Sequence, residues 1–86
     1  MNTHSHYLRN VKGYISAKVK GKVFLRLEND NLFIHIYFLD GTHFESIHTQ
    51  LSQKIDSGIT SQKLANSTLH DFECQLLDTY FISKKS

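Results

Sequence analysis

Residues 32–39, which read LFIHIYFL, limit the fold more than any other part of the chain. A strand with one face in water alternates apolar and polar residues, whereas this stretch is apolar or amphipathic on both faces. It is followed by Asp40-Gly41, and this dipeptide between two strand-like runs is a strong hairpin signal. We therefore predict a strand inside an antiparallel sheet. Only one face of this strand can point into the core of a small domain, so the molecule or segment that covers its other face is the best guide to function.

Three turns set the predicted sheet. We place a two-residue turn at 40–41, a turn at 29–30 and a three-residue loop at 20–22, which connect four strands in a meander. In this register Tyr37 faces Phe44. The aliphatic face collects Ile15, Ala17, Val19, Val23, Leu25, Leu27, Leu32, Ile34, Ile36, Phe38 and Ile47. The aromatic face collects Tyr14, Ser16, Lys18, Phe24, Arg26, Phe33, His35, Tyr37, Leu39, Phe44, Ser46 and His48.

Two residues of the fourth predicted strand disagree with this register. His43 and Glu45 fall on its aliphatic face, where polar side chains do not belong. An edge position or a bulge would explain them. The register is therefore least secure in this strand, because a slip by one residue exchanges its two faces.

The C-terminal half has the spacing of helices. A short helix runs over the apolar pair Leu51 and Ile55 and stops at Gly58, and Thr60 or Ser61 caps a longer helix that extends to about residue 81. The apolar stripe of the longer helix is Ala65, Leu69, Phe72, Leu76 and Tyr80. The fold class is α+β: a four-stranded antiparallel meander followed by a short and a long helix packed on one sheet face.

Length and composition predict one domain in a reducing compartment. The 86 residues suffice for a flexible N-terminal segment at 1–10 and a single domain at 11–86. Cys74 is the only cysteine, so no disulfide forms within the chain, which fits the cytoplasm. No apolar run is long enough to span a membrane, so we expect no membrane partner.

The charge of the chain is unevenly distributed. The net charge is +2, but residues 1–28 carry six basic side chains against one acid, while residues 29–86 carry four against seven. Basic residues near the predicted aromatic face would suit phosphates. The candidates are Lys18, Lys20, Lys22 and Arg26. These basic residues are equally consistent with a sheet edge that is simply exposed to water, because lysines commonly protect sheet edges from unwanted pairing.

The aromatic face is the predicted binding surface. Its candidate residues are Tyr14, Phe24, Phe33, His35, Tyr37, Phe44 and His48. Three covers are conceivable: the chain's own N-terminal segment or short helix, another protein or a second copy of the chain, and single-stranded nucleic acid stacked on the rings. The acidic C-terminal half and the lack of a glycine-aromatic RNA-binding motif argue against nucleic acid.

The sequence favours no catalytic, metal or cofactor site. His35 and His48 lie diagonally on neighbouring predicted strands without a third ligand, whereas zinc sites use at least three protein ligands. Cys74 has His70 four residues away, a spacing common by chance. The helix–Gly58–helix pattern faintly resembles a helix-turn-helix, but the acidic later positions of its second helix would repel phosphate.

We therefore predict a small non-enzymatic protein-interaction module of accessory, regulatory or inhibitor type. It would bind another protein through the aromatic face, with a homodimer as the expected form, because pairing hides an apolar patch on a small domain. The alternative is a single-stranded nucleic-acid binding protein that uses the same aromatic and basic face.

Overall fold

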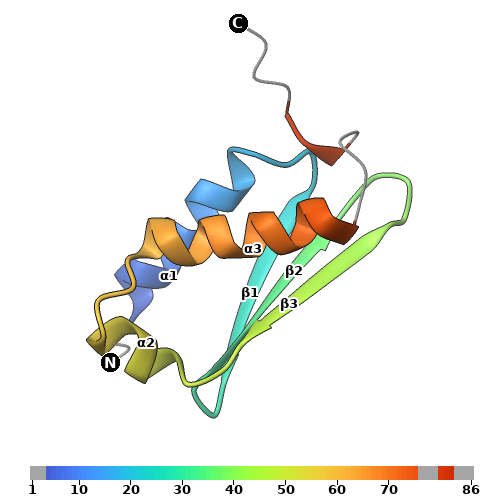
Figure 1. Ribbon diagram of the computed structural model, residues 1–86. Coiled ribbons are helices and arrows are strands. Elements are labelled where there is room, and N and C mark those ends of the chain that lie inside the picture. The colour runs from blue at the N-terminus through green and yellow to red at the C-terminus, as the bar shows by residue number, and fades with distance from the viewer. Residues whose placement is uncertain (1–3, 76–79, 83–86) are drawn as a thin grey trace, which may run out of the picture.

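The computed structural model describes residues 4–75 and 80–82 of the chain. Its elements in chain order are α1 (Ser5–Ser16), β1 (Lys22–Glu28), β2 (Asn31–Tyr37), β3 (His43–His48), α2 (Leu51–Asp56) and α3 (Ser61–Gln75). The strands form one antiparallel sheet in the order β1-β2-β3. Figure 1 shows α1 and α3 packed against each other on the same side of this sheet. The α+β class and the antiparallel sheet are confirmed.

The predicted four-strand meander is wrong, because the first predicted strand is part of α1. Residues 14–19 alternate in polarity, but Leu8, Val11 and Ile15 also follow helical spacing, and the helix buries Val11 and Ile15 completely. Residues 5–10, predicted to belong to a flexible segment, are the first half of this helix, while residues 1–3 lie outside the described part.

The segment between α1 and β1 is held by the C-terminal end of the described chain. Val19 forms an isolated bridge with Phe81, and the amide of Lys20 donates to the carbonyl of Tyr80 over 2.9 Å. Gly21 does not adopt the left-handed conformation that a hairpin loop would need. It is required by space, because a Cβ here would lie 2.7 Å from the Tyr37 carbonyl oxygen.

The predicted register between β1 and β2 is confirmed. Leu25 pairs with Ile34, and the turn lies at Asn29-Asp30, where both residues have positive φ (50° and 64°). A two-residue turn with both residues left-handed is the type I′ turn that matches the twist of the flanking strands. This turn fixes which residues of β1 and β2 point to the core.

The predicted register of β3 is wrong by one residue. The amide of Phe38 donates to the Thr42 carbonyl and the amide of Gly41 to the Phe38 carbonyl, each over 3.0 Å, so the loop has three residues rather than two. Gly41 takes the left-handed conformation (φ 91°) that such a loop requires. Tyr37 therefore pairs with His43 instead of Phe44, and every side chain of β3 changes face.

Both C-terminal helices are present where the sequence placed their beginnings. Gly58 ends the turn after α2 with φ 97°, and the Thr60 hydroxyl accepts a hydrogen bond from the Lys63 amide as the cap of α3. The predicted end near residue 81 is wrong, because Phe81 bridges to Val19. Leu76 of the predicted stripe lies outside the described residues.

The core lies between the sheet and the two longer helices. Phe72 of α3 is fully buried, with ring centroids 4.5 Å from Phe81, 4.9 Å from Phe44 and 5.6 Å from Phe38. The other buried apolar residues are Val11, Ile15, Val19, Val23, Leu32, Ile34, Ile36, Leu51, Leu64, Ala65 and Leu69. β2 and β3 bury alternate residues, and β1 alternates between exposed residues and buried or half-buried ones, so the opposite sheet face carries the remaining residues.

Candidate interaction face

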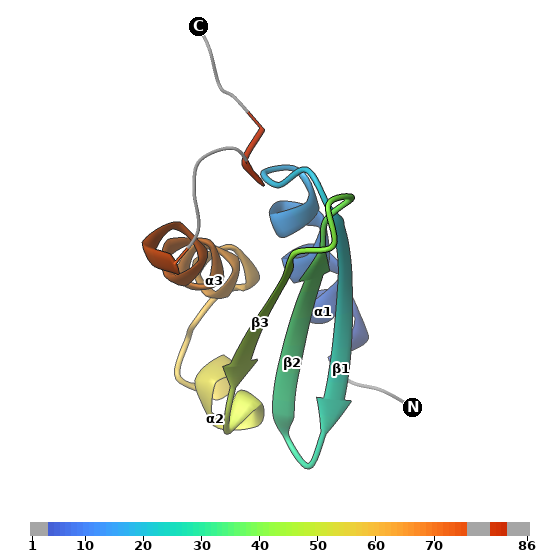
Figure 2. The same ribbon diagram turned by 90° about the vertical axis from the view of Figure 1, so that its right-hand side faces the viewer.

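We call the sheet face that points away from α1 and α3 the open face. It is built from Lys22, Phe24, Arg26 and Glu28 of β1, Asn31, Phe33, His35 and Tyr37 of β2, and His43, Glu45 and Ile47 of β3. No helix of the described chain lies over this face; in Figure 2 α1 lies behind the strands and α3, seen nearly end-on, lies beside β3. The second face of β2 is therefore not covered by the described part of the chain.

Aromatic rings form a continuous row across the open face. The rings of Tyr37 and His43 stack with centroids 4.4 Å apart and planes within 6°, and Phe24 meets the edge of Tyr37 at 5.7 Å. His35 continues the row, with its Nδ1 3.2 Å from Nε2 of His43. These contacts arise because residues paired or diagonal across strands point to the same side of the sheet. The result is a surface whose rings are already held in contact with one another.

Charged groups lie at one side of the ring row. The guanidinium of Arg26 sits 4.1 Å above the centre of the Phe33 ring and bonds the Glu28 carboxylate at 2.6 Å. Glu45 lies 3.9 Å from Nε2 of His35. The face therefore combines apolar rings with both signs of charge, and charged side chains of this kind are almost never found in a closed core.

Four of the seven predicted interaction residues come together on the open face, and three do not. Phe24, Phe33, His35 and Tyr37 lie there as predicted. Tyr14 is on α1, behind the sheet, because its segment is a helix rather than a strand. Phe44 and His48 are in the core, because the three-residue loop shifts β3 by one position.

Sequence reasoning missed the three β3 residues of the open face. His43, Glu45 and Ile47 occupy the positions that had been given to Phe44, Ser46 and His48. A signal was present in the sequence: His43 and Glu45 were the two polar residues that the predicted register placed against the aliphatic side. A shift by one residue would have removed both conflicts.

The four predicted phosphate-binding residues are also only partly brought together on the open face. Lys22 and Arg26 lie on the open face, on β1. Lys20 is exposed in the segment before β1, and Lys18 lines a cavity of about 310 Å³ beside α3, with His70 and Glu73. The structure therefore gathers two of the four predicted phosphate-binding side chains beside the rings.

His48 has a structural role instead of a surface one. The Thr68 hydroxyl donates to the Leu64 carbonyl at 3.1 Å, so it accepts from Nε2 of His48 at 2.8 Å, and both side chains are buried. Burial and the nearby charge of Lys54 lower the pKa of His48 below 6.5, against a smaller opposing effect of Asp71. The neutral ring is the form that fits the core.

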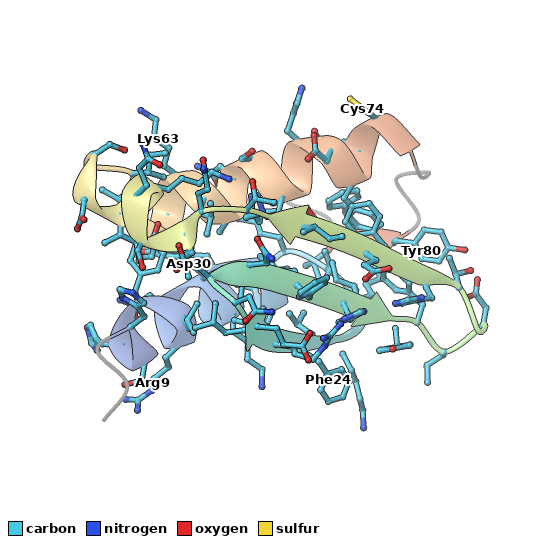
Figure 3. The ribbon with its side chains drawn as sticks, turned by 90° about the horizontal axis from the view of Figure 1, so that it is seen from below. Arg9, Phe24, Asp30, Lys63, Cys74 and Tyr80 are labelled. Carbon is cyan, nitrogen blue, oxygen red and sulfur yellow. The ribbon has the colours of Figure 1, made fainter. Side chains whose placement is uncertain are left out.

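Other reactive groups are sparse in the described chain. Cys74 is exposed on α3, with its Sγ 4.0 Å from Nε2 of His70, and Figure 3 shows it across the molecule from Phe24. Among residues 4–75 and 80–82, no three histidine, cysteine or acidic side chains lie close enough to share a metal ion. No described helix combines the length and the apolar character needed to cross a bilayer.

Comparison with known proteins gives no relative. No family model matches the chain, and neither a curated protein nor a solved structure resembles it significantly. The case for a function therefore rests on the open face itself.

Proposed function

We propose that this chain is a non-enzymatic protein-interaction module that binds another protein chain through the open face, with a second copy of itself as one partner. One observation carries the proposal: Phe24, Tyr37 and Ile47 expose 49%, 46% and 53% of their surface on the same face of the sheet, with the rings of Phe24 and Tyr37 in contact. Contiguous apolar patches on monomers commonly mark binding sites.

The composition of the open face supports a protein partner. Aromatic residues and arginine are enriched at the centres of interfaces, where a flat and rigid surface loses little conformational entropy on binding. Phe24, Tyr37 and His43 are already held by ring contacts, and Arg26 is held by Phe33. Binding therefore has few side chains left to order.

Self-association through the open face is tested by sedimentation equilibrium over a wide concentration range. We expect the wild-type chain to dimerise and Tyr37→Glu to weaken dimerisation at least about tenfold, because a carboxylate would replace the central ring of the interface. Tyr14→Glu is the matched control: Tyr14 is 40% exposed but lies on α1, so this change should leave dimerisation intact. Equal effects of both substitutions would contradict the role of the face.

A second candidate function is single-stranded nucleic-acid binding on the same face. The near-parallel rings of Tyr37 and His43 next to Phe24, with Lys22 and Arg26 on the same strand as Phe24, match the combination of stacking platform and cations that such proteins use.

The nucleic-acid alternative is decided by fluorescence anisotropy with mixed-sequence oligonucleotides at low salt, where phosphate contacts are strongest. Binding that Phe24→Ala weakens and Tyr14→Ala leaves unchanged would favour nucleic acid over a protein partner. Absence of binding at low salt would eliminate this alternative.

We also propose that the chain works without a catalytic centre and in the cytoplasm. The exposed free thiol of Cys74 supports a reducing compartment, because exposed unpaired cysteines are prone to oxidation outside it. Location in cells, measured with a fluorescent fusion, tests this part.

A further inference from the structure

The outer edge of β1 is open along the whole strand. β1 is the end strand of the sheet, and within the described residues no segment pairs with its outer side. Long unprotected edges are templates for pairing with another strand, and proteins usually shorten or cover them. An open edge of seven residues therefore either pairs with another strand or carries features that prevent such pairing.

The turn after β1 determines which of its backbone groups face outward. In a two-residue type I′ hairpin the flanking residues, here Glu28 and Asn31, exchange both of their backbone hydrogen bonds. Orientation alternates along an antiparallel strand. The amides and carbonyls of Val23, Leu25 and Leu27 consequently point away from β2, toward solvent at the edge.

The sequence of β1, KVFLRLE, is complementary to itself when read in the opposite direction about Leu25. A second β1 in antiparallel orientation, with the two Leu25 residues opposite each other, pairs Lys22 with the partner's Glu28. It also pairs Phe24 with the partner's Arg26. These side chains all lie on the open-face side, at pairs without backbone hydrogen bonds, where side chains come closest. Opposite charges and a cation over a ring are both favourable there.

The neighbouring registers are unfavourable. Outward-facing groups recur at every second residue, so an alternative must slide the partner by two positions. One such slide pairs Lys22 with the partner's Arg26, and the other pairs Arg26 with the partner's Arg26. Both place like charges opposite each other, which destabilises a strand pair. Only the register centred on Leu25 uses the full strand and satisfies its charges.

The side of β1 that faces the helices has room for a second strand. A groove of about 340 Å³ lies there between α1 and β1, lined by Leu8, Arg9, Lys12 and the half-buried Leu25. The apolar side chains of a second β1 would point into this groove, while the long side chains of Arg9 and Lys12 can extend outward to water.

We propose that two copies of this chain pair through their β1 edges, antiparallel about Leu25, into one continuous six-stranded sheet. This two-fold contact is isologous, because the same strand serves both partners. Of the open face it engages only the β1 side chains at the edge, leaves those of β2 and β3 free, and joins the two ring rows into one larger surface. The pairing is therefore separate from a contact made through the open face, and the chain can make both.

Charge exchange tests the register. Sedimentation equilibrium should show that Glu28→Lys raises the dissociation constant of the dimer at least about tenfold, because two attractive cross-strand pairs become repulsive. Lys22→Glu should do the same, and the double variant K22E/E28K should restore association to near the wild-type value. Glu73→Lys, with the same charge change on an exposed position of α3, is the control and should leave the dimer unchanged.

Hydrogen exchange locates the contact independently of charge. The amides of Val23, Leu25 and Leu27 should exchange quickly in the dilute monomer and at least about tenfold more slowly in the dimer. A monomer at all concentrations, a dimer indifferent to Glu28→Lys, a double variant without rescue, or edge amides with unchanged exchange would each overturn the proposal. Dissociation by Tyr37→Glu alone would assign the dimer to the open face instead.

Discussion

His48 shows how a single residue can change from a surface candidate to a core element. It is buried against Thr68, and its neutral ring donates to a hydroxyl whose own proton is used by Leu64. A protonated imidazole here would have to be desolvated, so burial lowers its pKa below 6.5. The folded state thereby disfavours the proton that the unfolded chain takes up.

This linkage gives a pH dependence with a definite sign. Because the pKa of His48 is lowered on folding, the unfolded chain binds more protons as the pH falls below about 6.5, and the free energy of unfolding decreases over that range. It levels off below the folded-state pKa. Urea melts of the wild type at pH 7.5 and 5.5 should show this loss, and His48→Gln, which keeps an N–H donor, should reduce it.

The exposed His70 on α3 provides the control for this prediction. His70→Gln should leave the difference between the two pH values as in the wild type. A His48→Gln variant with the full wild-type pH dependence would show that other groups carry the proton linkage.

At the scale of elements, one turn both fixes a register and caps a helix. Asp30 has a left-handed backbone in the β1–β2 turn, and its carboxylate accepts from the Ser52 amide at 3.1 Å and from the Ser52 hydroxyl at 2.7 Å. Its carbonyl accepts from the Leu51 amide at 2.9 Å. The first turn of α2 is thus capped by a residue far away in the sequence, and Figure 3 shows Asp30 beside α2. Gln50, directly before α2, makes no side-chain cap.

Asp30→Gly separates the cap from the turn. Glycine accepts the left-handed backbone without strain, so the substitution removes the carboxylate and its hydrogen bonds to Ser52, which should cost about 1–2 kcal/mol of unfolding free energy. Asn29→Gly, at the other left-handed position of the same turn, removes no cap and should change stability by less than about 0.5 kcal/mol. Chemical denaturation of both variants measures the difference. Equal losses would mean that the turn, not the cap, stabilises the hairpin.

The elements that could be predicted from the sequence are those whose signals are local. Asn29-Asp30 fixed the β1–β2 pairing, and Gly58 and Thr60 marked the helix boundaries. Asp40-Gly41 fits both a two-residue and a three-residue loop, and the choice depends on long-range contacts: Asp40 accepts from Tyr80, whose hydroxyl also meets Thr42 at 2.9 Å. Sequence spacing alone does not contain this contact.

The prediction of a strand where the structure has the end of α1 also failed because the sequence pattern allows two readings. Residues 14–19 satisfy the period of a strand and residues 8–15 that of a helix, so the pattern is ambiguous over Tyr14 and Ile15. The helix is the better solution because it buries Val11 and Ile15 together against α3 and β1. The predicted site residues on β1 and β2 still lie on the open face, although the first predicted strand is a helix. Their register depends only on the turn between β1 and β2.

At the scale of the whole molecule, all described helices that pack on the sheet lie on one side. Within the described residues, one layer of helices covers one face of the sheet and leaves the other face exposed, and a domain of this size has little stability to spare. The exposed rings of Phe24 and Tyr37 are therefore a cost to the isolated chain that binding would remove. The open face and the free β1 edge meet along β1, so contacts at either one affect the same strand.

The most direct test of this account is the solvent accessibility of the open face as a function of concentration, measured by NMR with a soluble paramagnetic probe. The Ile47 methyl groups and the Tyr37 ring should broaden strongly in the dilute monomer and become protected as the chain associates. Leu39, fully exposed in the hairpin loop, is the internal reference and should broaden at every concentration. An Ile47 signal already shielded in the dilute monomer would mean that the chain covers the face itself, and would contradict the central claim.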